Sequence, residues 1–330
     1  MSMMGFFMGR GNAQMFANVG GVVKWFNPLL LLIELSLSDS YLYLLIFVGA
    51  SIAILIITVL VFASLFSLLH ELVSSIKMKN VYVRKELKIK NEFKTLLGIE
   101  FKRLFNSKMY FLNGVMGAMM CVLMTILSII STTPIAADPN AAEYFNILIV
   151  PIMIAIMMFI LSISNPSCSA LSIEGKSFWL AKTLPINMKK YMYAKILVTY
   201  IIFIPASMIS STIVVVFYHN DILGCVMAYV IPIIAILLFG VIGLINNVKH
   251  PKFKWKNEQE VVKNSVAVTF TMLFGFLISI VLGTVLIVVS IWSTLIAYIV
   301  VSIVLIVLFI ICLTHLRKIF VSRINAMEDL

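Results

Sequence analysis

Long runs of uncharged, apolar residues constrain this chain more than any other feature of its sequence. Of its 330 residues, 62% are hydrophobic and only 12% are charged, whereas an ordinary soluble domain has about 25% charged residues. A run of about 20 apolar residues without charge is long enough to cross a bilayer as a helix. The sequence therefore predicts an all-α, polytopic helical membrane protein with about seven transmembrane helices and an amphipathic interfacial helix.

Seven runs are long enough to span a membrane. The first is longer than a bilayer needs, which predicts that it tilts or projects beyond the membrane. The last two form one nearly unbroken apolar stretch, and Ser290 to Thr294 is the best place for a turn between two helices. The predicted spans are Tyr41–Leu69, Met109–Ser131, Tyr144–Ile163, Ile196–Tyr218, Ile222–Ile245, Val266–Val289 and Leu295–Leu313.

The basic residues predict how these spans are oriented. Residues 70–108 carry ten Lys and Arg, loops 172–195 and 247–265 carry five each, and the tail 314–330 carries three, which is 23 of the 25 in the chain. With seven spans, these four segments all fall on one side, and short loops rich in Lys and Arg stay in the cytoplasm. We therefore expect a multi-pass protein of the cell membrane, with the basic loops and the C-terminus in the cytoplasm and the N-terminus outside.

Composition divides the chain into five segments. The first lacks the pattern of a signal peptide, because Arg10 is followed by Gly, Asn and Ala rather than by an apolar core. The predicted segments are an N-terminal extracytoplasmic or interfacial segment (1–40), an isolated transmembrane helix (41–69), a basic cytoplasmic linker that ends in an amphipathic helix (70–108), a six-helix transmembrane module (109–313) and a cytoplasmic tail (314–330).

Residues 89–106 predict the amphipathic helix. Glu100 and Arg103 are among the charged residues that fill much of its polar face. A basic amphipathic helix beside a span is expected in the plane of the membrane interface, and a soluble helix that packs on a cytoplasmic partner is the alternative. The apolar residues that recur at helical spacing include Phe93, Leu97, Phe101 and Leu104.

The spans lack the residues that ion-driven transport and catalysis use. No Lys, Arg, Asp or Glu lies within a predicted span, whereas transporters driven by protons or sodium generally need intramembrane acids or unwound polar sites. His70-Glu71 lacks the second histidine of a zinc protease, and the four cysteines form no C-x-x-C pair. We predict no catalytic residue and no metal ligand. We also predict no nucleic-acid partner, since the basic residues lie in short loops between spans.

Gly175-Lys176-Ser177 is the tripeptide that ends a nucleotide-binding P-loop. A P-loop needs a glycine five residues before Gly175, and Ala170 stands there. The tripeptide also follows a membrane span, whereas a P-loop follows a buried strand in a soluble α/β domain. The sequence therefore predicts that this chain binds no nucleotide itself.

Loop 172–195 combines charge with large apolar residues, since Phe178 and Trp179 stand between Lys176 and Lys182. Two interpretations stay open. The loop is either an interfacial anchor whose lysines reach the headgroups, or a short docking helix whose aromatic residues fill a groove of a partner protein.

Loop 247–265 repeats this alternation around Lys254 and Trp255. Its composition favours a loop that faces an anionic lipid surface, and docking on a partner protein is the alternative. Asn257 is a suitable N-cap for a short helix that begins at Glu258, with acidic residues in its first turn.

Three segments resemble one family. The string EGKSFWLAKTLPINMKKYMYAK is similar to the cytoplasmic loop of bacterial ABC exporter permeases, within the type-2 ABC exporter superfamily. PKFKWKNEQEVVKNS resembles the second cytoplasmic loop of that family, and EFKTLLGIEFKRLFNSKMYFLN resembles the elbow helix and first span of its six-span permease module. The matches cover about residues 90–265, and the last two spans fit the module by count only.

The resemblance implies a membrane subunit that pairs with a separate cassette ATPase. ATP and Mg²⁺ are then expected in that partner, and this chain would bind no cofactor and would not be an enzyme. Residues 172–187 would hold a coupling helix that passes the motion of the ATPase to the spans. The implied contact residues are Glu174, Gly175, Lys176, Phe178, Trp179, Lys182 and Pro185, with Lys254, Trp255 and Glu258 in the second loop.

Many members of that family carry two six-span modules, and this chain has one complete module. It is therefore a fragment, a half-size permease that dimerises, or one partner of a split pair. The expected partners are the cassette ATPase, a second permease module and membrane lipids. The expected cargo is amphipathic or apolar, such as a peptide, a lipid or a drug, because the spans are free of charge. The alternatives are a membrane scaffold or sensor whose basic loops bind a regulator or anionic lipid and, third, a secondary transporter.

Overall fold

The structure is a computed structural model that describes residues 91–136, 142–218 and 221–326, together with a few isolated positions between 49 and 60. The chain divides into two compact units, Met1–Lys88 and Ile89–Leu330. The second unit contains all three of the continuously described ranges. The predictions made for residues 1–90, including the first span, lie outside these ranges.

Six long helices form the body of the second unit, and each coincides with one predicted span. By length and apolar composition, the described residues contain six candidate membrane spans. The polytopic all-α prediction is confirmed, and no strand occurs in the described part of the chain. The predicted turn is also present between the last two helices. The long helices are α6 (Lys108–Ala136), α7 (Ala142–Ile163), α9 (Met188–Phe217), α10 (Ile222–Lys249), α12 (Val266–Ser290) and α13 (Thr294–Ala326).

The central helices are α7 and α10. They pack against each other and between them contact the other four long helices. In α10, every residue from 238 to 248 is buried. Two glycines of α10 allow close approach there. A Cβ on Gly240 would lie 2.5 Å from the Tyr200 ring, and one on Gly243 would lie 2.8 Å from the Asn165 amide. Because real Cβ atoms do not come that close, these glycines let the core pack at this density.

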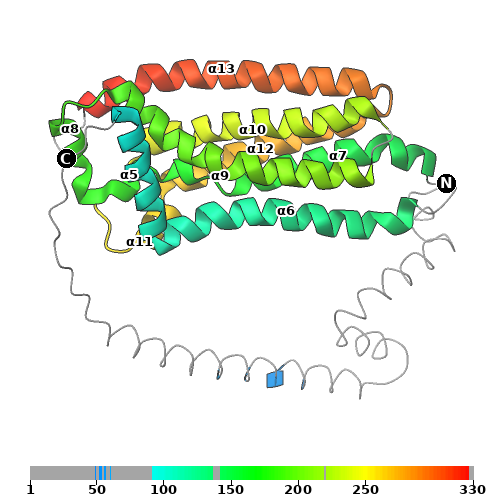
Figure 1. The fold of residues 1–330 in the computed structure, drawn as a ribbon, viewed down its shortest axis with the longest axis horizontal. Helices are drawn as coiled ribbons and strands as arrows, with labels where there is room; N and C mark the ends of the chain where they lie inside the picture. Colours follow the sequence, from blue (N-terminus) through cyan, green and yellow to red (C-terminus); the bar gives the residue numbers. More distant parts are fainter. Residues whose placement is uncertain are drawn as a thin grey trace. The chain divides into compact units, whose positions relative to one another are not determined.

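Shorter helices gather at one end of the bundle, which we call the basic end because the basic loops lie there. Figure 1 shows α5 (Glu92–Asn106) lying across the ends of the long helices, with α8 (Phe178–Thr183) and α11 (Glu258–Val262) beside it. The predicted N-cap of α11 is confirmed, since Asn257 Oδ1 accepts a hydrogen bond from the Gln259 backbone N–H at 3.3 Å.

Helix α5 confirms the predicted amphipathic helix but corrects the assignment of its faces. Leu104 is buried, and Phe93, Leu97 and Phe101 are half-buried, as expected for the apolar face. Glu100, however, was expected on the polar face and is only 3% exposed. The physical reason is a buried ion pair with Lys195 of α9, which turns this acidic residue toward the bundle.

Candidate functional site

The connection between α7 and α9 folds back into the basic end of the bundle. Its residues 164–175 are all buried and include the short helices η1 (Pro166–Cys168) and η2 (Ser172–Ser177). Buried backbone needs hydrogen-bond partners, and Asn247 of α10 supplies them. The Asn247 Oδ1 accepts from the backbone N–H groups of Leu171 at 2.7 Å and Ser172 at 3.2 Å, and its Nδ2 donates to Ser172 Oγ at 2.7 Å.

Lys195 lies at the centre of a buried cluster of charges. Its side chain is fully buried, and its Nζ lies 2.5 Å from Glu174 Oε1 and 3.0 Å from Glu100 Oε1. It also donates a hydrogen bond to the Ala170 carbonyl at 2.8 Å. A lysine is almost never fully buried unless it is paired, and this one has three partners from two other segments of the chain.

Arg103 and Tyr191 complete the cluster. The Arg103 Nη1 lies 2.5 Å from Glu100 Oε1 and 3.0 Å from Glu174 Oε1. The Tyr191 hydroxyl donates to Glu174 Oε1 at 2.5 Å. The ion cluster therefore consists of two carboxylates, two cations and one hydroxyl, and it joins α5, η2 and α9.

The charges of the ion cluster balance, which is what allows them to be buried. Burial alone would lower the pKa of Arg103, but the carboxylates of Glu100 and Glu174 outweigh it and raise that pKa well above its ordinary value. Arg103 therefore stays charged. Removing one member of a buried ion pair costs about 3–5 kcal/mol, because the other member is left buried without a partner. The cluster thus fixes the position of η2 relative to α5 and α9.

Gly175 has a backbone that other residues do not readily adopt. Its φ of 52° and ψ of −128° lie in a region that is open to glycine because it has no Cβ. The Trp255 indole packs directly over it, and an added Cβ would lie 2.9 Å from the indole Nε1. That Nε1 donates a hydrogen bond to the Ser172 carbonyl at 3.0 Å. Gly175 and Trp255 therefore join the two basic loops.

Helix α8 begins directly after this kink and has a buried side and an exposed side. On the buried side, Phe178 stacks on Phe253 with ring centroids 4.5 Å apart. On the exposed side, Trp179 is 59% exposed, Leu180 is 44% exposed and Leu184, just past the helix, is 51% exposed. We call Trp179, Leu180 and Leu184 the α8 surface. It is a small apolar surface at the basic end, and the stacking of Phe178 on Phe253 holds the helix that carries it in place.

Two further contacts tie the second basic loop to the junction between α5 and α6 and to η2. Ser107 Oγ donates to Glu258 Oε2 at 2.7 Å. The Lys252 backbone N–H donates to Ser172 Oγ at 2.9 Å, and the Lys252 Nζ lies 3.0 Å from Glu260 Oε2. The second loop therefore supports the first loop through η2.

The structure places the predicted contact residues in different surroundings. Trp179, Pro185 and Lys254 are exposed, while Glu174, Gly175 and Phe178 are buried and point into the bundle. These three residues pack inside the basic end, where they contact α9, Trp255 and Phe253. Trp255 and Glu258 are half-buried and face the first loop and Ser107. Lys176 lies in η2 and Lys182 in α8.

Sequence reasoning missed Lys195 and Asn247 and placed Glu100 on the wrong face. Lys195 was assigned to the end of a loop, whereas α9 begins at Met188 and carries it into the buried part of the bundle. A signal for Glu100 was present. It lies four residues after Leu96 and four before Leu104, both buried, so an acid stands on the apolar stripe of α5. An acid in that position indicates a buried cation partner.

The described residues contain no group of three or more His, Cys, Asp or Glu side chains placed to hold a metal ion. Cys121 and Cys168 are buried, Cys225 and Cys312 are half-buried, and all four are free thiols.

Comparison with known families gives one match. The model of a family described as "Membrane protein of 12 TMs" matches residues 1–315. No curated protein and no solved structure matches the chain. The family description states a number of spans and no activity, so an exporter function needs support of its own. Because the match covers most of the chain, the chain belongs to the family of membrane proteins with twelve transmembrane segments.

Proposed function

We propose that this chain is the membrane subunit of an ATP-driven exporter and that a separate cassette ATPase docks on the α8 surface. The observation that carries the proposal is that α8 exposes Trp179 while the neighbouring Phe178 is buried and stacks on Phe253. Tryptophan is enriched at the energetic centres of protein interfaces. Its position at the basic end supports the proposal, because the positive-inside rule predicts that this end faces the cytoplasm, where a cassette ATPase binds.

The buried ion cluster supplies the mechanical link that this function needs. A partner that pushes on Trp179 moves α8, which begins three residues after Gly175 and four after Glu174. Glu174 is bound to Lys195 of α9, at 2.5 Å, and to Arg103 of α5, at 3.0 Å. Packed elements move as units because close-packed interiors transmit strain. A displacement of α8 is therefore passed to α9, which is a candidate span, and to α5, which precedes the candidate span α6.

A groove on the outer face of the bundle suits the apolar cargo expected from the sequence. It has a volume of about 300 Å³ and lies between α6 and α7. Met116, Met120 and Met124 line it, and Asn113 and Ser164 form a polar end. Methionine side chains are flexible and polarizable and adapt to varied apolar ligands. In this proposal, the groove is where an amphipathic molecule from the bilayer first contacts the protein.

A second permease module is part of the proposal. The family description gives twelve spans, and the described residues contain six candidate spans. We propose that the transport pathway forms between this module and another one, supplied by a second copy, a different chain or a longer form of this chain. ATP and Mg²⁺ are bound by the ATPase, and this chain binds neither.

The test compares two exposed tryptophans at opposite ends of the bundle. Trp179→Ala removes the proposed anchor, and Trp292→Ala removes a side chain that is 79% exposed, in the turn between α12 and α13. The wild-type chain is first used to capture a cassette ATPase from its source cells. Each variant is then co-expressed with that ATPase, and the amount that co-purifies is measured. Truncating an interface hot spot costs about 2 kcal/mol or more, so we expect at least about 30-fold weaker binding of the ATPase to Trp179→Ala and no change with Trp292→Ala.

Two results would contradict the proposal. In the first, the wild-type chain retains no ATPase, or both variants retain it equally. In the second, transport by the wild-type chain stops when the ion gradient is dissipated but continues without the ATPase, which is the behaviour of a secondary transporter.

A further inference from the structure

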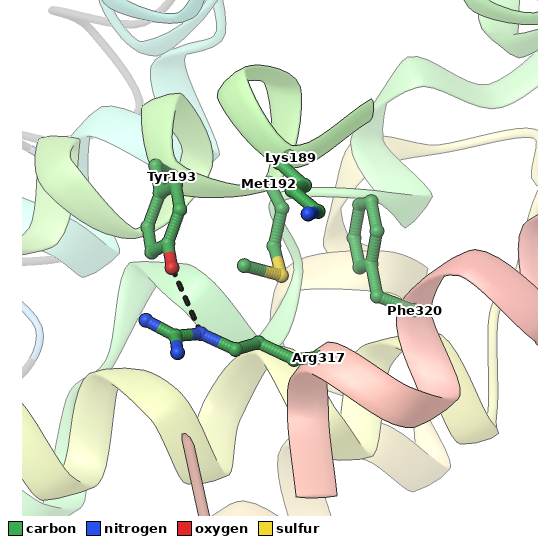
Figure 2. Close-up of a pocket in the computed structure, with 5 residues that line it drawn as sticks. All are labelled: Lys189, Met192, Tyr193, Arg317 and Phe320. Carbon is green, nitrogen blue, oxygen red and sulfur yellow. Dashed lines mark hydrogen bonds between the residues drawn. The ribbon is translucent and has the colours of Figure 1, made fainter. Parts of the chain in front are cut away.

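A second cavity lies at the basic end, between the first turns of α9 and the last turns of α13. Its volume is about 300 Å³. Figure 2 shows the five side chains that line it, with Lys189, Met192 and Tyr193 from α9 and Arg317 and Phe320 from α13. Met192 and Phe320 are buried and form an apolar floor, whereas Lys189 and Arg317 are exposed at its rim.

No acid in the described part of the chain neutralises the two cations at the rim. The Arg317 Nε donates to the Tyr193 hydroxyl at 3.0 Å, and the guanidinium lies 5.9 Å from the Tyr193 ring centre. This contact holds the guanidinium in place and leaves its two terminal nitrogens without a partner among the described residues. The Lys189 amine also lacks one there. Among the described residues, no acidic side chain lines the cavity, and Glu92 is already bound to Lys190, the residue after Lys189, at 2.5 Å.

We propose that this cavity binds the phosphate headgroup of an anionic phospholipid. Two unpaired cations, one of them a guanidinium held in a fixed orientation, suit a phosphate group. Tyr193 places an amphipathic ring at the rim, as is common at the headgroup level of membranes. Basic pockets between spans on the cytoplasmic side are where anionic headgroups bind, and the charge distribution predicts that this is the cytoplasmic side.

The surface of α13 favours a lipid over free phosphate as the source of that group. Ile303 and Ile310 precede Arg317 at intervals of seven residues, so the three lie on one face of the helix. Ile303 is 55% exposed and Ile310 is 53% exposed, and Ile306, on the same face, is 42% exposed. An acyl chain can therefore lie along this apolar stripe while its headgroup meets Arg317. A free phosphate would gain nothing from the stripe or from the apolar floor.

A lipid in this cavity would also contact the surroundings of the ion cluster. The Phe320 ring in the floor lies 6.3 Å from the ring of Tyr191, which donates to Glu174. The headgroup would thus hold α9 and α13 together beside the cluster. This inference does not rest on an ATPase partner and holds for a scaffold as well as for an exporter.

The experiment uses the full chain purified in a neutral detergent. Bound lipids are counted by native mass spectrometry during titration with phosphatidylglycerol, with phosphatidylcholine and with inorganic phosphate. The test variant is Lys189→Gln with Arg317→Gln. The matched control is Lys256→Gln with Lys318→Gln, which removes the same charge from two exposed lysines outside the cavity. Near a surface each cation contributes about 1 kcal/mol, so we expect phosphatidylglycerol affinity to fall about 30-fold in the test variant and less than about twofold in the control.

Four outcomes would overturn the proposal. Equal binding of phosphatidylglycerol and phosphatidylcholine would show that the headgroup charge is not recognised. Equal losses in the two double variants would show a diffuse charge effect. Displacement of the lipid by inorganic phosphate at millimolar concentration would make free phosphate the ligand. Loss of a co-purifying protein from the test variant with unchanged lipid binding would make the cavity a protein contact.

Discussion

The connection between α7 and α9 and the connection between α12 and α13 lie at opposite ends of the bundle (Figure 1). Each exposes a tryptophan, Trp179 in the first and Trp292 in the second. The short turn, residues 291–293, satisfies its backbone locally, because Trp292 N and Ser293 N donate to the Val289 carbonyl at 3.1 and 3.0 Å. The long connection is held instead by buried side chains from α5, α9 and α10.

The difference shows what the long connection adds beyond joining two spans. A turn of three residues is enough to join neighbouring helices, as the α12–α13 connection demonstrates. The α7–α9 connection carries a buried acid, which is costly unless a cation pairs with it. It also carries a glycine at a positive φ, which a residue with a Cβ would adopt only under strain. Such costs are found where a segment must hold a defined position for function. Three predictions test whether the long connection is fixed in this way.

The largest effect is expected from Lys195→Met. This change leaves Glu174 and Glu100 buried with Arg103 as their only cation, so the free energy of unfolding should fall by about 3–5 kcal/mol. Thermal unfolding in detergent measures the loss. The control is Lys318→Met, which removes an exposed lysine from the same end of the bundle and should change stability by less than about 0.5 kcal/mol.

A double variant separates charge from packing. In Lys195→Met with Glu174→Gln, one positive and one negative charge leave together, and Glu100 keeps its 2.5 Å contact with Arg103. Part of the lost stability should return, because no carboxylate is left unbalanced. The ion cluster loses its proposed role if Lys195→Met is as harmless as Lys318→Met, or if the second change lowers stability further.

The next effect in size is expected from Gly175→Ala. Its positive φ and its contact with the Trp255 indole predict a loss of about 1–3 kcal/mol. Gly98→Ala in α5 is a control with the opposite sign. A Cβ there meets nothing within 4 Å, and alanine in a helix interior is more stable than glycine by about 0.5–1 kcal/mol. If both variants shift the unfolding temperature in the same direction, the kink at Gly175 is not fixed by its surroundings.

The spans could be predicted from the sequence because the membrane acts on composition. Each of the six runs from Met109 to Leu313 forms a helix, and most of the predicted ends lie within a few residues of the observed ones. The reason is that a bilayer requires about 20 apolar residues whatever their order. The α11 cap at Asn257 was predictable for a related reason, because a capping side chain and the N–H group it binds are only two residues apart.

The ion cluster could not be predicted in full because its members are far apart in the chain. Lys195 meets Glu174 across 21 residues and Glu100 across 95 residues, and no local pattern links such positions. Its burial depends on how η2 folds back against Asn247. The kink at Gly175 has the same origin, since it is Trp255 from the second loop that closes over it. The sequence could therefore indicate contact residues in the two loops only by their chemical type, whereas the packing of the folded chain determines which of them are exposed.

The smallest effect is expected at the exposed edge of the long connection, where Glu92 of α5 binds Lys190 of α9 at 2.5 Å and the Asn187 backbone N–H at 2.8 Å. The hydrogen bond from Lys190, followed by that from Asn187, holds the pKa of Glu92 below its ordinary value of 4.5. As the pH falls, the unfolded chain therefore takes up this proton first. The stabilisation is complete above the unfolded pKa and is lost as the pH falls through the lower, folded pKa.

Glu92→Gln should consequently lower Tm slightly at pH 7 and should match the wild type at about pH 3. The effect is small because both side chains are more than one-third exposed and water screens such pairs. Ser293→Ala is the control in the short connection, where residues 291–293 contain no titratable side chain. Its effect on Tm should be the same at both pH values. A difference between Glu92→Gln and wild type that persists at about pH 3 would mean that Glu92 acts through packing rather than through charge, and the two connections would then respond to acid alike.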